Sequence, residues 1–538
     1  MPRRITRAGV IGLVAAGVLL IAVSGSTQPP TPGQHNEHSR FTTQDAPYPP
    51  QPRDATNIRP VQPVTFATAS ATPDAIAAAA SADPAVQAEL GPDAELLGVE
   101  TVDPKDGEVS HRVGWFDTAA NETVEAVVVE GSVTEVVRTA ASEWQPPLSA
   151  AEGDTAIAIG REHWGERAAG LQGFVMHTME TDGSYPDRRL AYVTFAEHVD
   201  ARPQLLTWVD LSSGTVERSR EDDASGPAPA EPTHAMDTSF LGFGDGPGDG
   251  TPRQGMVEWN GWSFVYDVSG RNDGISLNDV TYQDVPIMDR ASMPSMTVFY
   301  DDDACGPFVD RLGGELFAVE WADDAEIVLR EFEQDGQQWL ELGILDILGE
   351  YVLYQNYYIG EDGQIDAHTF AKGLQCVVDH VHYPFWRFDF DINGAADDVI
   401  SRRAADGFLV DEPVEFDRSA AEAVEHDWRV RDRATGVTVD LTFDDGTWNV
   451  PGVVIPEVLY DTNRVYGRQY ANSEAGTWRW PALDYIPGNE EEPIDGQDVV
   501  LWYRGFLPHT ADEGPDLWHS TGVRLQVHFP VDHFVRQQ

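Results

Sequence analysis

The sequence predicts small α+β units in the N-terminal half, followed by a large all-β sandwich, and three observations support this fold class. Two consecutive stretches, 71–146 and 147–221, each read as one helix followed by three or four strands. From 253 to 538, short aromatic and β-branched runs alternate with Gly, Asp and Asn turns, with almost no helical periodicity. Two further stretches, 27–70 and 222–252, are rich in turn-forming and polar residues, which predicts linkers that bury no core.

The two small units have the same predicted order of elements. The first begins with an alanine-rich helical run near Pro73–Leu90, and the second with the run SAAEGDTAIAIGREHW. Each is predicted to pack one helix on an antiparallel sheet, as a weak internal repeat. Neither unit carries a cluster of reactive side chains, so we expect both to act as scaffold or as a partner surface.

The chain of 538 residues has 90 acidic and 35 basic residues, which gives a formal net charge of −55. This charge repels nucleic acids and anionic lipids, so neither is an expected partner. Lysine is nearly absent: only Lys105 and Lys372 occur, and the other basic residues are arginines. Such a composition indicates adaptation to high salt, where ions screen self-repulsion. The alternative is an acidic protein from a GC-rich genome.

The N-terminus has the pattern of an export signal. Arginines at positions 3, 4 and 7 precede the apolar run Ala8–Val23, and small residues follow, which predicts a signal peptide within 1–26. The run is short for a spanning helix, which needs about 20 residues, and an uncleaved anchor is the alternative. We therefore expect an exported, extracellular or cell-surface protein, in which Cys305 and Cys376 could pair.

Two histidines stand one residue apart in the strand-like stretch DHVHYPFWRFDFDING, which covers 379–394. Side chains at i and i+2 share one face of a strand, so His380 and His382 can reach the same copper or zinc ion. A polar sheet face is the alternative, because this spacing alone is weak evidence. Further histidines that could complete a site are His509, His519, His528 and His533.

Four stretches resemble, in the same order, motifs of the copper amine oxidases, whose quinone cofactor forms from one of their own tyrosines. They are the segment 257–300, the strand and hairpin YVLYQNYYIGEDGQIDAHTFAKG, the stretch HVHYPFWRFDFDING and the strand DVVLWYRGFLPH. The resemblance covers about 251–529, and the two small units resemble the paired small α/β domains of that family. It implies a divergent copper amine oxidase-like catalytic domain and a homodimer.

The resemblance also assigns residues. His380, His382 and His509 match the three copper ligands, a set of neutral imidazoles that suits Cu(II). His519, His528 and His533 match nothing in the motif, and we expect surface or sheet positions for them. Tyr351 matches the tyrosine that copper and O2 convert to topaquinone. This cofactor implies oxidation of a primary amine by O2 to an aldehyde, with release of ammonia and hydrogen peroxide.

Other residues of this chain also match functional positions of the same family. Tyr300 matches the tyrosine that hydrogen-bonds the quinone, with an ordinary strand aromatic as the alternative. Asp310 is the candidate base for removing the substrate α-proton, and Asp301, Asp302 and Asp303 are its competitors. A second, structural cation such as calcium is implied by matches to its ligands. These matches are the carboxylates of Asp389 and Asp498 and the backbone carbonyls of Phe390 and Val499.

The chain departs from the family pattern around its tyrosine. The family has Thr-x-x-Asn-Tyr followed by an acid, whereas this chain has the stretch ILGEYV at 347–352. Tyr354, Tyr357 and Tyr358 lie nearby, and QNYY mimics Asn-Tyr, but the offset to the following hairpin favours Tyr351. Two alternatives to an oxidase follow: a non-catalytic homologue that binds copper or presents a surface, and a secreted β-sandwich with an incidental histidine pair.

Overall fold

The structure is a computed structural model. It describes residues 55–65, 73–92, 94–102, 105, 109–142, 145, 148–176, 188–197, 204–221, 251–268, 274–300, 308–310, 312, 326–348, 351–374, 379–423, 426–444, 463–470, 492–511 and 518–530. Outside these residues lie the predicted signal segment 1–26, the linker 222–252 up to residue 250, Cys305, Cys376, Glu350, His533 and the aspartates 301–303. Among the described residues, no helix is long and apolar enough to cross a membrane.

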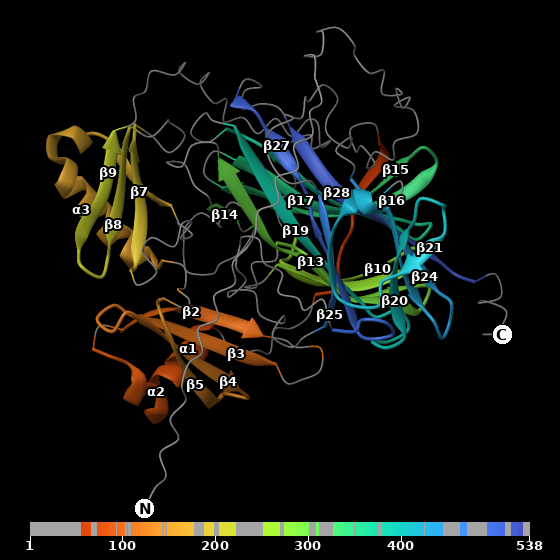
Figure 1. Cartoon of the computed structure of the whole chain (residues 1–538), viewed down its shortest axis with the longest axis horizontal. Coiled ribbons are helices and arrows are strands. Elements are labelled where there is room, and N and C mark those ends of the chain that lie inside the picture. The colour runs from red at the N-terminus through yellow and green to blue at the C-terminus, as the bar shows by residue number, and fades with distance from the viewer. Residues whose placement is uncertain are drawn as a thin grey trace, which may run out of the picture. The chain divides into compact units, whose positions relative to one another are not determined.

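Each small unit contains helices beside a four-stranded antiparallel meander (Figure 1). The first has α1 (Pro73–Ala82), α2 (Pro84–Glu89), β2 (Ala94–Val102), β3 (Ser110–Asp117), β4 (Glu122–Val129) and β5 (Ser132–Ala140). The second has α3 (Ala150–Trp164), the 3-10 turn Gly165–Ala168, β6 (Gln172–Met176), β7 (Leu190–Ala196), β8 (Leu205–Asp210) and β9 (Thr215–Glu221). The repeated order of elements is therefore present in the structure.

Local signals explain how the helices begin and end. Ser149 caps α3 through a capping box, in which its side chain and that of Glu152 satisfy each other's backbone N–H groups. The alanine-rich run forms two helices instead of one, because Asp83 caps a new helix that starts with Pro84. Proline fits the first turn of a helix but not its interior, so it separates α1 from α2.

The remaining described strands form two ten-stranded antiparallel sheets. The first sheet contains, in spatial order, β1 (Thr56–Pro60), β15 (Glu326–Gln334), β16 (Gln337–Leu348), β17 (Tyr351–Gly360), β18 (Gln364–Lys372), β28 (His519–His528), β24 (Thr438–Phe443), β23 (Asp427–Asp432), β20 (Asp398–Arg403) and β21 (Leu409–Asp411). The second contains β10 (Gln254–Trp259), β11 (Trp262–Asp267), β12 (Ser276–Tyr282), β13 (Val285–Tyr300), β19 (His380–Phe390), β26 (Val499–Arg504), β25 (Arg464–Gln469) and β22 (Phe416–Ser419), with β14 (Phe308–Asp310) paired to β13 and β27 (Leu507–His509) paired to β19.

The predicted all-β sandwich is confirmed, and its hairpins follow from the turn residues. Asp335 and Gly336 join β15 to β16 and both have positive φ, as two-residue hairpin turns require. Asn260 and Gly261 do the same between β10 and β11. One large apolar cluster lies inside the sandwich and includes fully buried tryptophans and tyrosines from both sheets.

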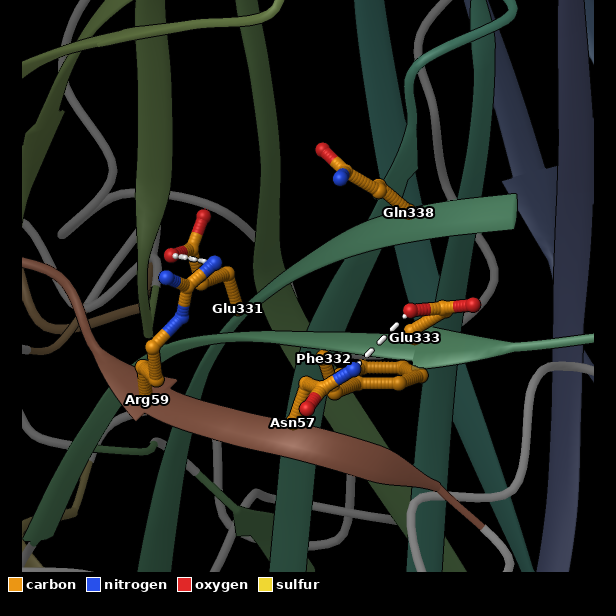
Figure 2. Close-up of a pocket in the computed structure, with 6 residues that line it drawn as sticks. All are labelled: Asn57, Arg59, Glu331, Phe332, Glu333 and Gln338. Atoms are coloured by element: carbon orange, nitrogen blue, oxygen red, sulfur yellow. Dashed lines mark hydrogen bonds and ion pairs between the residues drawn. The ribbon is translucent and has the colours of Figure 1, made fainter. Parts of the chain in front are cut away.

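One stretch of the predicted linker 27–70 is ordered, which corrects that prediction. Thr56–Pro60 forms β1, an edge strand that pairs with β15. Polar side chains fasten it: Arg59 lies 2.9 Å from Glu331, and the Asn57 amide donates to Glu333 at 3.0 Å. Figure 2 shows these side chains around a surface pocket between the two strands, and none of the predicted site residues lines it. The local composition of 27–70 predicted a linker because the strand that stabilises β1, which is β15, is distant in sequence.

We expect Gly522→Ala to destabilise the sandwich, because β28 approaches β18 closely at this point. A Cβ at position 522 would lie 2.4 Å from the Ala367 carbonyl oxygen and 2.6 Å from the His368 ring. Thermal or denaturant unfolding should show a loss of about 1–3 kcal/mol. The control is Gly153→Ala in α3, where the new methyl would only touch Val175 at 3.7 Å. It should gain up to about 1 kcal/mol from helix propensity. A neutral Gly522→Ala would contradict the expected strand contact.

Candidate active site

The strand register brings the sequence-predicted histidines together at one end of the second sheet. Tyr300 on β13 pairs with His380 on β19, and His380 pairs on its other side with His509 on β27. Figure 1 shows these three strands within the same sheet. Because side chains alternate along a strand, His382 projects from the same face as His380. Residues more than 100 positions apart in the chain thus become direct neighbours.

Two of the three ring pairs lie within the separation that a shared metal ion allows. The ring centroid of His380 lies 5.1 Å from that of His382 and 5.1 Å from that of His509. With nitrogen–metal bonds of about 2 Å, rings that share an ion can have centroids up to about 6 Å apart. All three side chains are buried, and Nδ1 of His382 has no hydrogen-bond partner among the described residues. This donor set fits copper.

Tyr351 reaches this cluster from the opposite sheet. It is the first residue of β17, and its buried ring lies 5.2 Å from the His380 ring and 4.7 Å from the His382 ring, between centroids. Its hydroxyl oxygen is 2.9 Å from that of Tyr300, a hydrogen-bonding distance. The structure therefore brings together the proposed cofactor tyrosine, its proposed hydrogen-bond partner and two proposed copper ligands.

Two other tyrosines of β17, Tyr354 and Tyr357, form structural hydrogen bonds within the sandwich. The Tyr357 hydroxyl donates to the backbone carbonyls of Ile275 and Ala291, at 3.2 and 3.0 Å. The Tyr354 hydroxyl donates to the Glu341 carboxylate at 2.7 Å. Burial, followed by the charge of Glu341, raises the pKa of Tyr354 well above its usual value. These hydroxyls hold the sandwich together, in agreement with the choice of Tyr351.

Asp310 lies on the other edge of β13, next to the histidines. It pairs with Met296, two residues before the partner of His382, so Asp310 and His382 face the same side of the sheet. The Asp310 carboxylate is 3.3 Å from Nε2 of His382. The candidate base is thus part of the cluster, and its observed contact is with a proposed copper ligand.

His519, for which a surface or sheet position was expected, is a sheet residue, but it is fully buried at the start of β28 and lies beside the candidate copper ligands. Its ring centroid lies 4.3 Å from that of His509, across the two sheets. Burial, and then the neighbouring His509 and His382, lower the pKa of His519 to about 3. It is therefore a neutral imidazole near His509 and His382. No local motif reveals it, because the two sheets must first be stacked.

A second cluster forms around the predicted structural cation ligands. The side chains of Asp389 and Asp498 converge as predicted, and Asp391 joins them; among the described residues, only this trio of acids has ligand atoms all within 4.8 Å of one another. The ring nitrogens of the three histidines are not all so close, so those side chains would have to rotate to share an ion. Phe390 and Val499 are paired in the strands beside the acids.

The centre of this acidic cluster is occupied by the ammonium group of Lys105. Its Nζ lies 2.8 Å from Asp389, 2.5 Å from Asp391 and 2.7 Å from Asp498. Calcium would need oxygen atoms at about 2.3–2.6 Å around the same position. The arrangement therefore does not fit the calcium ion that the family resemblance implied.

The charges in this acidic cluster influence one another strongly. Burial alone would lower the pKa of Lys105, but the three carboxylates raise it above its usual value. Burial, partly offset by Lys105, raises the pKa of Asp391 to about 7 and that of Asp498 to about 6. One lysine thus compensates the three acids, of which Asp389 is buried and the other two are partly buried, only in part.

Comparisons with known proteins agree with the overall fold. Residues 251–307 match the family model described as copper amine oxidase, enzyme domain. No curated protein matches the sequence. The fold is similar to that of a copper-containing benzylamine oxidase from Hansenula polymorpha, with a TM-score of 0.62 and 13% identity over 87% of this chain and 98% of that one.

Two further solved structures show the same similarity. The lysyl oxidase of Pichia pastoris has a TM-score of 0.58 at 11% identity, covering 87% of this chain and 92% of that one. An amine oxidase from Aspergillus nidulans has a TM-score of 0.52 at 11% identity, covering 89% and 92%. The resemblance inferred from the sequence is therefore confirmed at the level of the fold: this chain has the fold of the copper amine oxidases, and residues 251–307 match their family model.

Proposed function

We propose that the protein is an exported, salt-adapted oxidase of primary amines that uses copper and a quinone derived from Tyr351. One observation carries this proposal: the Tyr351 ring lies against the rings of His380 and His382, with its hydroxyl 2.9 Å from that of Tyr300. A metal ion held by these histidines would be adjacent to the phenol. The family resemblance further supports a homodimer, and the apolar run at 8–23 supports export or an N-terminal anchor.

Different residues of this chain would have different roles in the proposed reaction. His380, His382 and His509 would hold copper, and the Tyr300 hydroxyl would fix the ring at position 351 through its hydrogen bond. Copper and the quinone would supply the redox chemistry, by which a primary amine and O2 give an aldehyde, ammonia and hydrogen peroxide.

Asp310 is proposed to accept the α-proton of the substrate. Its carboxylate lies among the site residues, and general-base catalysis requires only a short reach to the proton. Its contact with His382 gives it a second candidate task, which is to orient that imidazole for copper. The two tasks have different consequences when the charge is removed.

We expect quinone formation to depend on Tyr351. Protein incubated with copper and air should acquire a visible quinone absorption and give a coloured adduct with phenylhydrazine. Tyr351→Phe should show neither signal. The matched control is Tyr357→Phe on the same strand, which loses a structural hydrogen bond worth about 1 kcal/mol but should keep the colour. Wild-type protein that binds copper but stays colourless would instead support a non-catalytic copper-binding homologue.

We expect Asp310→Asn to lower kcat/KM for primary amines by about 10²- to 10⁴-fold, as removal of a general base does. Copper content and the phenylhydrazine adduct should stay at wild-type levels, because the base acts after the quinone has formed. Steady-state kinetics and elemental analysis would be measured on the same samples. A variant that loses copper in proportion to its activity would show that Asp310 positions His382 instead.

A further inference from the structure

The turn between β2 and β3 in the first small unit inserts one side chain among acids of the sandwich. That side chain is Lys105, whose Nζ contacts Asp389, Asp391 and Asp498 at 2.5–2.8 Å and whose side chain is only 7% exposed. An ammonium group has three N–H donors, one for each carboxylate. Every donor can thus be satisfied inside the acidic cluster.

We propose that Lys105 is a built-in cation that takes the place of a metal ion at this acidic cluster and fastens the β2–β3 turn to the sandwich. The acids alone would not support the proposal, because carboxylates often gather without any ligand. The buried ammonium at their centre is the second observation, since it is the cation that the acids already hold. Its position and that of a calcium ion are mutually exclusive.

The surroundings fix Lys105 from several directions. Its backbone N–H donates to the Tyr470 hydroxyl at 3.0 Å, and its Nζ lies 4.9 Å from the centroid of the Tyr470 ring. The backbone N–H of Tyr470 donates in turn to the carbonyl of Asp498 at 2.9 Å. The turn, the aromatic ring and one acid therefore form a closed set of contacts, which a freely moving surface lysine would lack.

A second cation, the buried Arg387, contacts one acid of the cluster. Arg387 donates to Oδ2 of Asp389 at 3.1 Å, while Lys105 binds Oδ1 of the same carboxylate. A planar guanidinium suits two oxygens side by side, whereas a compact ammonium suits a three-sided cage. This difference explains why a chain that otherwise uses arginine has one of its two lysines here.

The proposal predicts that wild-type protein needs no divalent cation at this cluster. Calcium content after desalting and the thermal midpoint with and without calcium would be measured in molar NaCl, which screens the acidic surface. Wild-type protein should retain no more calcium than the Asp391→Asn variant. Its thermal midpoint should not rise when calcium is added. Neither readout requires oxidase activity, so failure of the proposed oxidase function would leave this test unaffected.

Removing the ammonium should uncover a cation site. In Lys105→Ala the three acids lose their cation, and the midpoint should fall by roughly 5 °C or more. Calcium should then bind at one saturable site per chain and restore most of the loss, and Asp391→Asn added to this variant should abolish both effects. Lys105→Met, which keeps the methylene stem, gives a second variant if the alanine protein does not fold.

The matched control removes the only other lysine. Lys372 lies 5.5 Å from the Trp518 ring centroid, and Lys372→Met should create no calcium site. Wild-type protein that retains one calcium per chain, and loses it in Asp391→Asn, would overturn the proposal. So would Lys105 variants that keep the wild-type midpoint without calcium, because the lysine would then stabilise nothing.

Discussion

The pairing of strand β19 with both of its neighbours determines where nearly every side chain of the site lies. On one side, β13 contributes Tyr300 opposite His380, and on the other, β27 contributes His509. Farther along, the same strand carries Asp389 beside β26, where the acidic cluster forms. A shift of this register by one residue would turn both histidines to the other face. Sheet hydrogen bonding, and not any single catalytic group, therefore holds the arrangement.

The second requirement is the stacking of the two sheets. Tyr351 and His519 come from the sheet that contains β17 and β28, while the remaining histidines come from the other sheet. In the buried interior of the sandwich, their rings lie 4.3–5.2 Å from histidine rings of the other sheet, between centroids. Such interiors are packed as densely as organic crystals, so the separation of the sheets is well defined.

Local sequence patterns were sufficient for the fold class, whereas the candidate site residues came from the family resemblance. Turn pairs such as Asp335-Gly336 and alternating aromatic residues identify the hairpins, and within that resemblance the offset from the hairpin after β17 favours Tyr351. The features that the sequence did not reveal depend on contacts between residues that are far apart in the chain. His519 becomes a neighbour of His509 only after the sheets stack, and Lys105 meets Asp389 from 284 positions away. Strand β1 was missed for the same reason, since its partner β15 lies far along the chain.

The burial of both lysines has a chemical consequence under the proposed activity, which would release aldehydes. A free amine condenses with an aldehyde to form an imine, and exposed lysines are the usual protein targets of that reaction. Here the side chain of Lys105 is 7% exposed, and Lys372 is 6% exposed. Arginine, which supplies the rest of the basic charge, stays protonated and is a far poorer nucleophile. Under the proposed activity, the protein offers its own product almost no lysine to modify.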